Sequence, residues 1–211
     1  RSMARQGLVN VKRAVPSVKV ALMYARPDNF CHRVLYRALR DAYVLPACAE
    51  ALRKAQAELK RRRPDLSLCI FDATRPMSVQ QTMWDAVKNT PQYYYVSNPA
   101  HGGGMHNYGM AVDISLCKAS WDDSTWRDGA ARCRIDTVPM GTKVDYMGAA
   151  SHIDKEQELV SRRIISREAL ANRRLLREVM RAAGFMPLHT EWWHFNLCTR
   201  AWARKNLKPH P

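Results

Sequence analysis

The chain has 211 residues, of which 46% are hydrophobic and 25% charged, a composition typical of a globular protein with one well-buried core. We therefore expect a single domain over residues 1–211. No apolar run approaches the roughly 18 to 20 residues that a membrane-spanning helix needs, which predicts a soluble chain without a transmembrane segment.

The charge is strongly basic: 34 Lys and Arg stand against 19 Asp and Glu, a formal net charge of +15. Such an excess suits a polyanionic partner. The basic residues cluster in helix-like segments, however, such as KRRR at Lys60–Arg63, without a helix-turn-helix or aromatic-rich nucleic-acid motif. We interpret them as solvated helix faces, with attraction to an anionic cell envelope, and expect no specific nucleic-acid partner.

The first clear elements are a helix and a strand. The helix is predicted from Pro46 to Arg62, where apolar residues recur at helical spacing, and Pro64 ends it. The apolar, partly β-branched run Leu66–Ala73 then predicts a buried strand. Arg75 follows that strand directly. The apolar helix positions are Ala47, Leu52, Ala55 and Leu59.

A second helix is predicted through Val87, with Ser78 as its N-cap, and residues 97–104 are a loop by composition. The next stretch, AVDISL (residues 111–116), alternates like a strand. Because neighbouring side chains of a strand point to opposite faces, Asp113 is expected on the face opposite the aliphatic residues.

Residues Trp121 to Lys155 lack periodicity and are expected to form loops with at most one short strand, of the kind that shapes a binding site. A third helix is predicted from an N-cap at Ser166 through Ala183, and a final strand over His189–Leu197. Helices separated by strands without regular βαβ spacing indicate an α+β fold with a central antiparallel sheet and flanking helices. The expected buried stripe of the third helix is Leu175, Leu176, Val179, Met180 and Ala183.

The six cysteines contain no CxxC pair, which argues against thiolate zinc chemistry. Cys69 lies in an apolar run and is expected to be a small buried hydrophobe. Cys117 and Cys133 flank a loop, so they are the first pair to test for a disulfide.

Two short stretches contain the best ligand candidates. His106 and Asp113 occur in HNYGMAVD, and Glu191 and His194 in EWWH. Two histidines and one carboxylate form an ordinary catalytic zinc set that leaves a fourth position for water. Spacing alone also fits a loop histidine, a capping aspartate and a strand-face histidine, so both interpretations remain open at this point.

The order of the motifs along the chain favours the metal site over the structural roles. HNYGMAVDISL, with DATRP (Asp72–Pro76) before it and EWWHF (Glu191–Phe195) after it, resembles the zinc D-alanyl-D-alanine dipeptidase family. The similarity extends to YARPDNF at Tyr24–Phe30 and VPMGTKVDYM at Val138–Met147. This resemblance implies a D-Ala-D-Ala metallopeptidase fold of the hedgehog-like type.

The resemblance also implies the catalytic roles. His106, Asp113 and His194 match the family's zinc ligands and would hold one Zn²⁺ per chain. Glu191 matches the catalytic base, and Arg75, at the end of the strand, matches the residue that stabilises the transition state. Zinc held this way lowers the pKa of water toward about 7.

Tyr24, Asp145 and Gly104 match substrate-pocket positions of the family. Two of the motifs depart from its pattern: Gly104 stands where a serine is usual, and Arg26 where a threonine is common. Because a glycine backbone can approach a ligand closely, we hypothesise that N–H groups near Gly102–Gly104 replace the serine hydroxyl in binding a carboxylate.

One spacing is incompatible with a regular strand. Glu191 and His194 are three residues apart, so in a regular strand they would point to opposite faces. We therefore predict a turn or bulge between them. Trp192 and Trp193 are expected in the core or the pocket wall, and no role is assigned to His101, His152 or His189.

The function that the resemblance implies is a zinc-dependent dipeptidase that hydrolyses D-Ala-D-Ala in bacterial cell-wall metabolism. One alternative is a D,D- or L,D-carboxypeptidase or endopeptidase acting on longer peptidoglycan stems, if residues Trp121–Lys155 leave an open groove. Another is a non-catalytic zinc-stabilised module that binds an anionic polymer, against which Glu191 argues, because a structural zinc site needs no base. We expect the periplasm or cell envelope, with the cytoplasm as the alternative.

Overall fold

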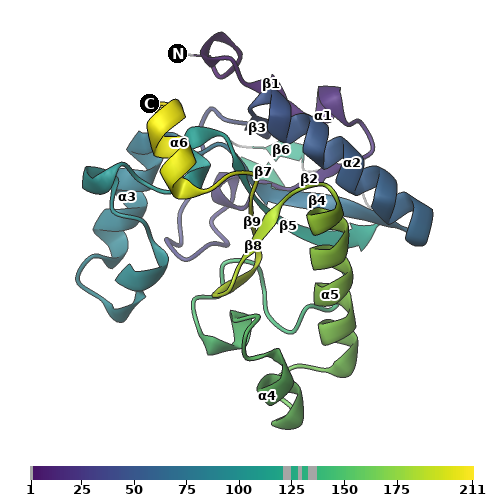
Figure 1. Cartoon of the computed structure of the whole chain (residues 1–211). Coiled ribbons are helices and arrows are strands. Elements are labelled where there is room, and N and C mark those ends of the chain that lie inside the picture. Colours follow the sequence, from purple (N-terminus) through teal and green to yellow (C-terminus); the bar gives the residue numbers. More distant parts are fainter. Residues whose placement is uncertain (1, 121–124, 128–129, 133–136) are drawn as a thin grey trace.

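The computed structural model describes residues 2–120, 125–127, 130–132 and 137–211, and its centre is a five-stranded sheet (Figure 1). The strand order is β2-β4-β5-β9-β8, and every neighbouring pair is antiparallel except β2 with β4. The predicted α+β fold with a central antiparallel sheet is therefore confirmed. The parallel strand β2 at the edge of the sheet was not predicted. The strands are β2 (Lys19–Val20), β4 (Leu66–Asp72), β5 (Ala111–Lys118), β9 (Glu191–Asn196) and β8 (Met186–Leu188).

Two long helices, α2 (Pro46–Arg62) and α5 (Arg167–Ala182), pack against each other and against the sheet (Figure 1). Both confirm predicted helices, and the Ser166 side chain caps α5 by accepting a hydrogen bond from the Ala169 N–H. The buried faces of the two helices differ from the predicted ones at a few positions. Ala47 is exposed, because the buried face of α2 begins with Cys48, and Arg173 joins the buried face of α5.

Helix α3 (Met77–Val87) begins two residues earlier than predicted, since its N-cap precedes Ser78 by two positions. Its N-cap is Pro76, and Ser78 makes no capping bond, so the prediction of a serine cap was wrong. The physical reason is that the proline ring fixes φ, here at −59°, and thereby sets the entry of the chain into the helix without a side-chain acceptor. Three short 3-10 helices follow α3: η3 (Pro91–Tyr95), η4 (Pro99–His101) and η5 (Met105–Tyr108).

Small elements complete the described chain. Residues near the start form a separate two-stranded sheet of β1 (Val9–Asn10) with β3 (Tyr43–Val44). Within residues 121–155, β6 (Thr125–Arg127) pairs with β7 (Ala130–Arg132), which is one strand more than expected there. The other elements are η1 (Ala4–Gln6), α1 (Val11–Ala14), η2 (Met23–Ala25), η6 (Ala149–Ser151), α4 (Glu156–Ser161) and α6 (Arg200–Asn206).

The cysteine predictions divide in two. Cys69 is fully buried in β4, as expected for a small hydrophobe. Cys117 is a buried free thiol near the Ser67 carbonyl oxygen, with 3.6 Å between sulfur and oxygen. Cys133, its expected partner, lies outside the described residues.

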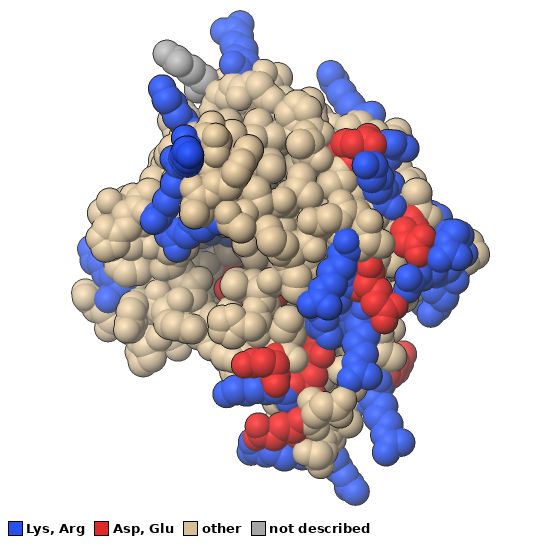
Figure 2. Space-filling view, in the orientation of Figure 1, with Lys and Arg blue, Asp and Glu red and all other residues tan. Residues whose placement is uncertain are grey.

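The surface charge is mixed rather than concentrated. Figure 2 shows Lys and Arg on many parts of one face, interleaved with Asp and Glu on the side where α4 and α5 lie. Several arginines on the helices are paired within one turn, among them Arg53 with Glu50 at 2.6 Å and Arg62 with Glu58 at 2.7 Å. Within the described ranges, no helix combines the length and apolar character that crossing a membrane requires.

Candidate metal and catalytic site

Strands β5 and β9 bring together two of the predicted ligands. Their antiparallel register places Asp113 directly opposite His194, and side chains at opposed positions share one face of the sheet. The Asp113 Oδ1 and His194 Nδ1 atoms lie 3.1 Å apart, and both residues are buried. The register of the sheet therefore explains how residues far apart in sequence meet here.

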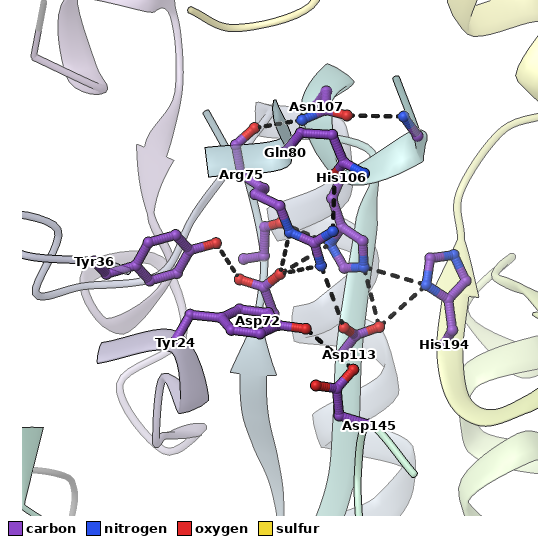
Figure 3. A network of polar contacts seen from close by, with 12 residues as sticks. Tyr24, Tyr36, Asp72, Arg75, Gln80, His106, Asn107, Asp113, Asp145 and His194 are labelled. Carbon is purple, nitrogen blue, oxygen red and sulfur yellow. Dashed lines mark hydrogen bonds and ion pairs between the residues drawn. The ribbon is translucent and has the colours of Figure 1, made fainter. Parts of the chain in front are cut away.

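His106 reaches the same point from the turn before β5. It lies in η5, which ends at Gly109 with a left-handed φ of +74°, and the chain then enters β5. A methyl group at Gly109 would also lie 2.9 Å from the Leu8 side chain, so glycine avoids both backbone strain and crowding here. His106 Nε2 is 3.0 Å from Asp113 Oδ1 and 3.2 Å from His194 Nδ1 (Figure 3). The spacing of seven residues thus spans a turn and the first part of a strand.

Neighbouring acceptors fix the tautomer of each histidine. His106 Nδ1 donates to the Ala73 carbonyl at 2.7 Å, and His194 Nε2 donates to Asn196 Oδ1 at 2.7 Å. The remaining ring nitrogens therefore direct lone pairs at each other and at the Asp113 carboxylate. Only a cation can satisfy three converging acceptors, and metal bonds of about 2.0 to 2.1 Å imply tetrahedral ligand spacings of about 3.3 Å. The three observed spacings fit such a metal closely.

Without a metal, a proton on His106 can supply part of the positive charge that the three acceptors favour. Burial alone would lower the pKa of His106, but the Asp113 carboxylate outweighs burial and raises it. Conversely, burial would raise the pKa of Asp113, and the two histidines lower it strongly instead. The site therefore stabilises positive charge at its centre.

A bulge in β4 brings a second carboxylate to the site. The register shifts between Ile70 and Asp72, so that Asp72, rather than Phe71, lies opposite Asp113. Asp72 is completely buried and accepts a 2.5 Å hydrogen bond from the Tyr36 hydroxyl (Figure 3). Two carboxylates in opposed positions repel each other unless a cation compensates them.

Arg75 supplies that compensation. Its Nε and Nη2 atoms both donate to Asp72 Oδ2, at 3.0 and 2.7 Å, while Nη1 donates to Gln80 Oε1 at 2.9 Å. Nη2 also lies 3.9 Å from Asp113 Oδ2, and the guanidinium lies over the Tyr24 ring. Burial would lower the pKa of Arg75, but Asp72 outweighs it and keeps the pKa above its ordinary value. Arg75 is therefore a fixed positive charge beside the ligands.

The predicted irregularity around Glu191 is confirmed. On β8, Pro187 pairs with Phe195 and the next residue, Leu188, pairs with Glu191, so Trp192 to His194 have no partner on β8. This bulge lets Glu191 and His194 point to the same cavity, with Glu191 Oε2 3.8 Å from His194 Nδ1. Burial is the main cause that raises the pKa of Glu191 to about 7.

These groups line one cavity of about 420 Å³, which appears as a hollow with acidic atoms at its floor in Figure 2. All eight residues predicted from the resemblance line it, so the structure brings the whole predicted set together. Trp193 forms part of the wall, as expected, and His189 also lines it although no role was assigned to it. The eight residues are Tyr24, Arg75, Gly104, His106, Asp113, Asp145, Glu191 and His194.

Asp145 occupies one end of the site. Its Oδ1 accepts a 3.1 Å hydrogen bond from the Tyr24 hydroxyl, whereas its buried Oδ2 has no hydrogen-bond partner. Its backbone is left-handed, with φ +73°, which is uncommon for a residue other than glycine. Burial and then the nearby Asp113 charge raise its pKa to about 7. Asp145 lines the cavity, and a carboxylate with one oxygen left without a partner is a site for a cationic group of a ligand.

The hypothesis about the glycine backbone was wrong. The N–H groups of Gly102, Gly103 and Gly104 already donate to Pro99 O, Asn98 O and Asn107 Oδ1, at 3.0, 3.2 and 2.8 Å. They are used to fold the turn and are unavailable to a carboxylate. A methyl group at Gly104 would lie 2.9 Å from the Ser97 hydroxyl oxygen, so glycine leaves room for the serine that lines the cavity there.

Several supporting residues escaped the sequence analysis. Asp72 lies three residues before Arg75, and Asn196 lies two residues after His194 on the same strand face, which are spacings that a search for partners could have used. Asn107 donates to the Arg75 carbonyl at 2.9 Å. Its own carbonyl accepts a 2.7 Å bond from the His210 N–H, while the Met77 N–H donates to the His210 carbonyl at 2.9 Å. No local pattern indicates that last contact.

Comparison with known proteins agrees with the geometry. The chain matches the family described as D-ala-D-ala dipeptidase over residues 4–209. It is 38% identical to a D-alanyl-D-alanine dipeptidase of Streptomyces coelicolor, over 95% of this chain and 92% of the relative. It is 29% identical to the Escherichia coli (strain K12) D-alanyl-D-alanine dipeptidase, over 90% of this chain and 84% of the relative. The chain therefore belongs to the D-Ala-D-Ala dipeptidase family of metallopeptidases, and it is an enzyme.

Proposed function

We propose that the enzyme is a zinc-dependent dipeptidase that hydrolyses D-Ala-D-Ala in bacterial peptidoglycan metabolism. The observation that carries this proposal is the convergence of His106 Nε2, His194 Nδ1 and Asp113 Oδ1 within 3.2 Å of one another, next to the carboxylate of Glu191. A structural metal site is closed by protein ligands, whereas three ligands beside a base and a cavity suit hydrolysis.

Zinc suits the donor set of two imidazoles and one carboxylate, and when bound it would polarise the scissile carbonyl and lower the pKa of water toward neutrality. The chain contributes ligand orientation, because Ala73 and Asn196 hold the two imidazole rings through their other nitrogens. Such supporting contacts typically change metal affinity by about 10- to 100-fold.

Glu191 is the proposed general base. Its carboxylate lies beside the ligands without belonging to their close triad, so it can accept a proton from the attacking water and pass it to the leaving amine. Burial favours the protonated form of Glu191, which makes the carboxylate a stronger base than an exposed glutamate. Help of this kind contributes about 10²- to 10⁴-fold to the rate.

Arg75 is the proposed stabiliser of negative charge on the carbonyl oxygen. Its guanidinium is held by Asp72 and Gln80, so it needs no reorganisation when that charge develops. A preorganised donor of this type typically contributes about 2.7 to 4 kcal/mol to the transition state.

Asp145 is the proposed anchor for the substrate's ammonium group. Its unpaired Oδ2 offers the acceptor that an ammonium requires, and the Tyr24 hydroxyl orients the carboxylate through Oδ1. Asp145 lies at one end of the polar network in Figure 3, with Asp113 between it and His106. A substrate anchored there would place its first peptide bond near the ligands.

The walls of the cavity support a short substrate over a longer stem peptide. The Tyr95 hydroxyl and His152 Nε2 lie 3.1 Å apart, which joins η3 to the segment after η6. Tyr95 and Met147 both line the cavity, so residues 137–155 help to enclose it rather than leave a groove. A volume of about 420 Å³ lies toward the small end of the usual range of about 300 to 1,000 Å³ for ligand sites.

The test is release of D-alanine from D-Ala-D-Ala by zinc-loaded protein, with Glu191→Gln as the control. We expect release by the wild type, and loss of at least about 100-fold in kcat for a folded, zinc-loaded Glu191→Gln variant. A pentapeptide stem ending in D-Ala-D-Ala is the comparison substrate. Preference for the pentapeptide would contradict the dipeptidase assignment in favour of a carboxypeptidase, and retained zinc without any hydrolysis would favour a binding module.

A further inference from the structure

The cavity contains a second arginine whose role the mechanism leaves unexplained. Among the described residues that line the cavity, Arg75 and Arg200 are the two arginines, and lysine is absent. Arg75 is buried, and Asp72 and Gln80 accept three of its hydrogen bonds and hold it beside the candidate ligands. Arg200 is exposed, and its Nη2 donates one 2.6 Å hydrogen bond to the Gly103 carbonyl. Arg200 therefore retains donors that can face a ligand in the cavity.

The fold holds Arg200 in place at the cavity wall. It is the first residue of α6, and the preceding Thr199 caps that helix by accepting a 3.2 Å bond from the Trp202 N–H. The bond to Gly103 ties the guanidinium to the turn that also carries Gly104 and, beside it, the hydroxyl of Ser97. Lys and Arg atoms reach the edge of the hollow below α6 in Figure 2.

This cationic position lies away from the anionic end of the site. Asn107, which binds the Gly104 N–H, lies at one end of the network in Figure 3, and Asp145 lies at the other, with His106 and Asp113 between them. The site thus has a carboxylate at one end and a guanidinium near the other. A dipeptide zwitterion carries the complementary pair, an ammonium at one end and a carboxylate at the other.

We propose that Arg200 is a specificity-determining residue that binds the C-terminal carboxylate of the substrate and so restricts cleavage to the bond one residue from a free carboxyl end. This proposal rests on the proposed dipeptidase function. The planar guanidinium matches a carboxylate better than the ammonium of lysine does, because it can donate two parallel hydrogen bonds. It also supplies the contact that the glycine N–H groups, already bonded within their own turn, do not.

The test measures binding, so that it does not depend on turnover. Zinc-loaded Glu191→Gln protein is titrated by calorimetry with D-Ala-D-Ala and with its C-terminal amide, which lacks the carboxylate charge. We expect about 10- to 100-fold tighter binding of the free acid, the range for one charge-assisted contact. Adding Arg200→Gln should remove this preference while leaving the affinity for the amide within about twofold, and Arg200→Lys should retain part of it.

Arg204 is the matched control. It lies on the same helix and donates to the His101 carbonyl of the same turn, but it does not line the cavity, so Arg204→Gln should keep the full preference for the acid. An undiminished preference in Arg200→Gln would overturn the proposal, as would an equal loss of affinity for acid and amide. If wild-type protein releases no D-alanine while the acid preference still depends on Arg200, the dipeptidase function fails and the Arg200 proposal stands. If neither the dipeptide nor its amide binds, both the dipeptidase function and the Arg200 proposal are contradicted.

Discussion

Asp72 and Asp113 lie directly opposite each other on β4 and β5, although both carboxylates are buried. A regular register would place Phe71 opposite Asp113, so the one-residue bulge creates this costly pairing. Arg75 lies within 2.7 Å of Asp72 and 3.9 Å of Asp113, and it compensates both charges. Repulsion between the two carboxylates therefore remains in the site, and a cation bound between the ligands would reduce it further.

Arg75→Met should destabilise the metal-free protein by about 3 to 5 kcal/mol, since removing one partner leaves buried charge uncompensated. The measurement is urea unfolding in the presence of a chelator. In the double variant Arg75→Met/Asp72→Asn the opposed charge is gone, so more than half of the lost stability should return. An equally unstable double variant would show that Arg75 acts by packing alone.

Asn196→Ala should lower zinc affinity by about 10- to 100-fold, because His194 loses the acceptor that fixes its tautomer. The measurement is competition with a chromogenic chelator at constant pH. Asn206, which is exposed and donates only to the Trp202 carbonyl, supplies the control, and Asn206→Ala should bind zinc like the wild type. Equal affinities in both variants would remove Asn196 from the metal site.

Asp145→Asn should change how stability depends on pH. Burial raises the folded-state pKa of Asp145 to about 7, whereas an unfolded aspartate titrates near 3.9. Between about pH 4 and pH 7 the native state therefore holds a proton that the unfolded chain releases, and stability falls as pH rises. Asparagine also tolerates the left-handed backbone, so it should remove this slope with little strain.

The effect of Asp145→Asn is measured by urea unfolding of metal-free protein at intervals from pH 4 to pH 8. The variant should gain stability relative to the wild type as pH rises, by at most about 4 kcal/mol at 1.4 kcal/mol per pKa unit. Asp28→Asn is the control at an exposed position, where no such gain is expected. A constant difference across the pH range would contradict the raised pKa.

Arg173→Met should lower the free energy of unfolding by about 2 to 3 kcal/mol. The buried guanidinium donates to the carbonyls of Met140 and Ala150, which flank Asp145 in sequence, at 2.7 and 2.8 Å. Losing these bonds leaves buried acceptors unpaired and should also raise KM for D-Ala-D-Ala, because the Asp145 segment loses its support. Arg174 is exposed and serves as the control: Arg174→Met should change neither the free energy of unfolding nor KM.

The sequence predicted elements whose information is local. Hydrophobic periodicity located α2 and α5 accurately, and the alternating run AVDISL located β5. The start of α3 was missed by two residues, because the N-cap is Pro76 and not Ser78. The parallel pairing of β2 with β4 was missed because a two-residue strand has too little pattern to detect.

For the site, motif spacing and the family resemblance predicted the residues that meet in the cavity, and strand geometry alone predicted the bulge near Glu191. Other features depend on contacts between distant residues. The bulge that opposes Asp72 to Asp113 and the approach of Arg200 to Gly103 both follow from tertiary packing. No pattern within a single segment indicates them.

The bond between the His210 N–H and the Asn107 carbonyl has a consequence for biosynthesis. Asn107 neighbours His106, so the turn that presents this ligand is completed only by residues made long after it. At roughly 5 to 20 residues per second, several seconds of translation separate the two. The growing chain can form its sheet before that moment, but the turn gains this hydrogen bond only afterwards. The turn that presents His106 should therefore reach its full stability only once translation has passed residue 210.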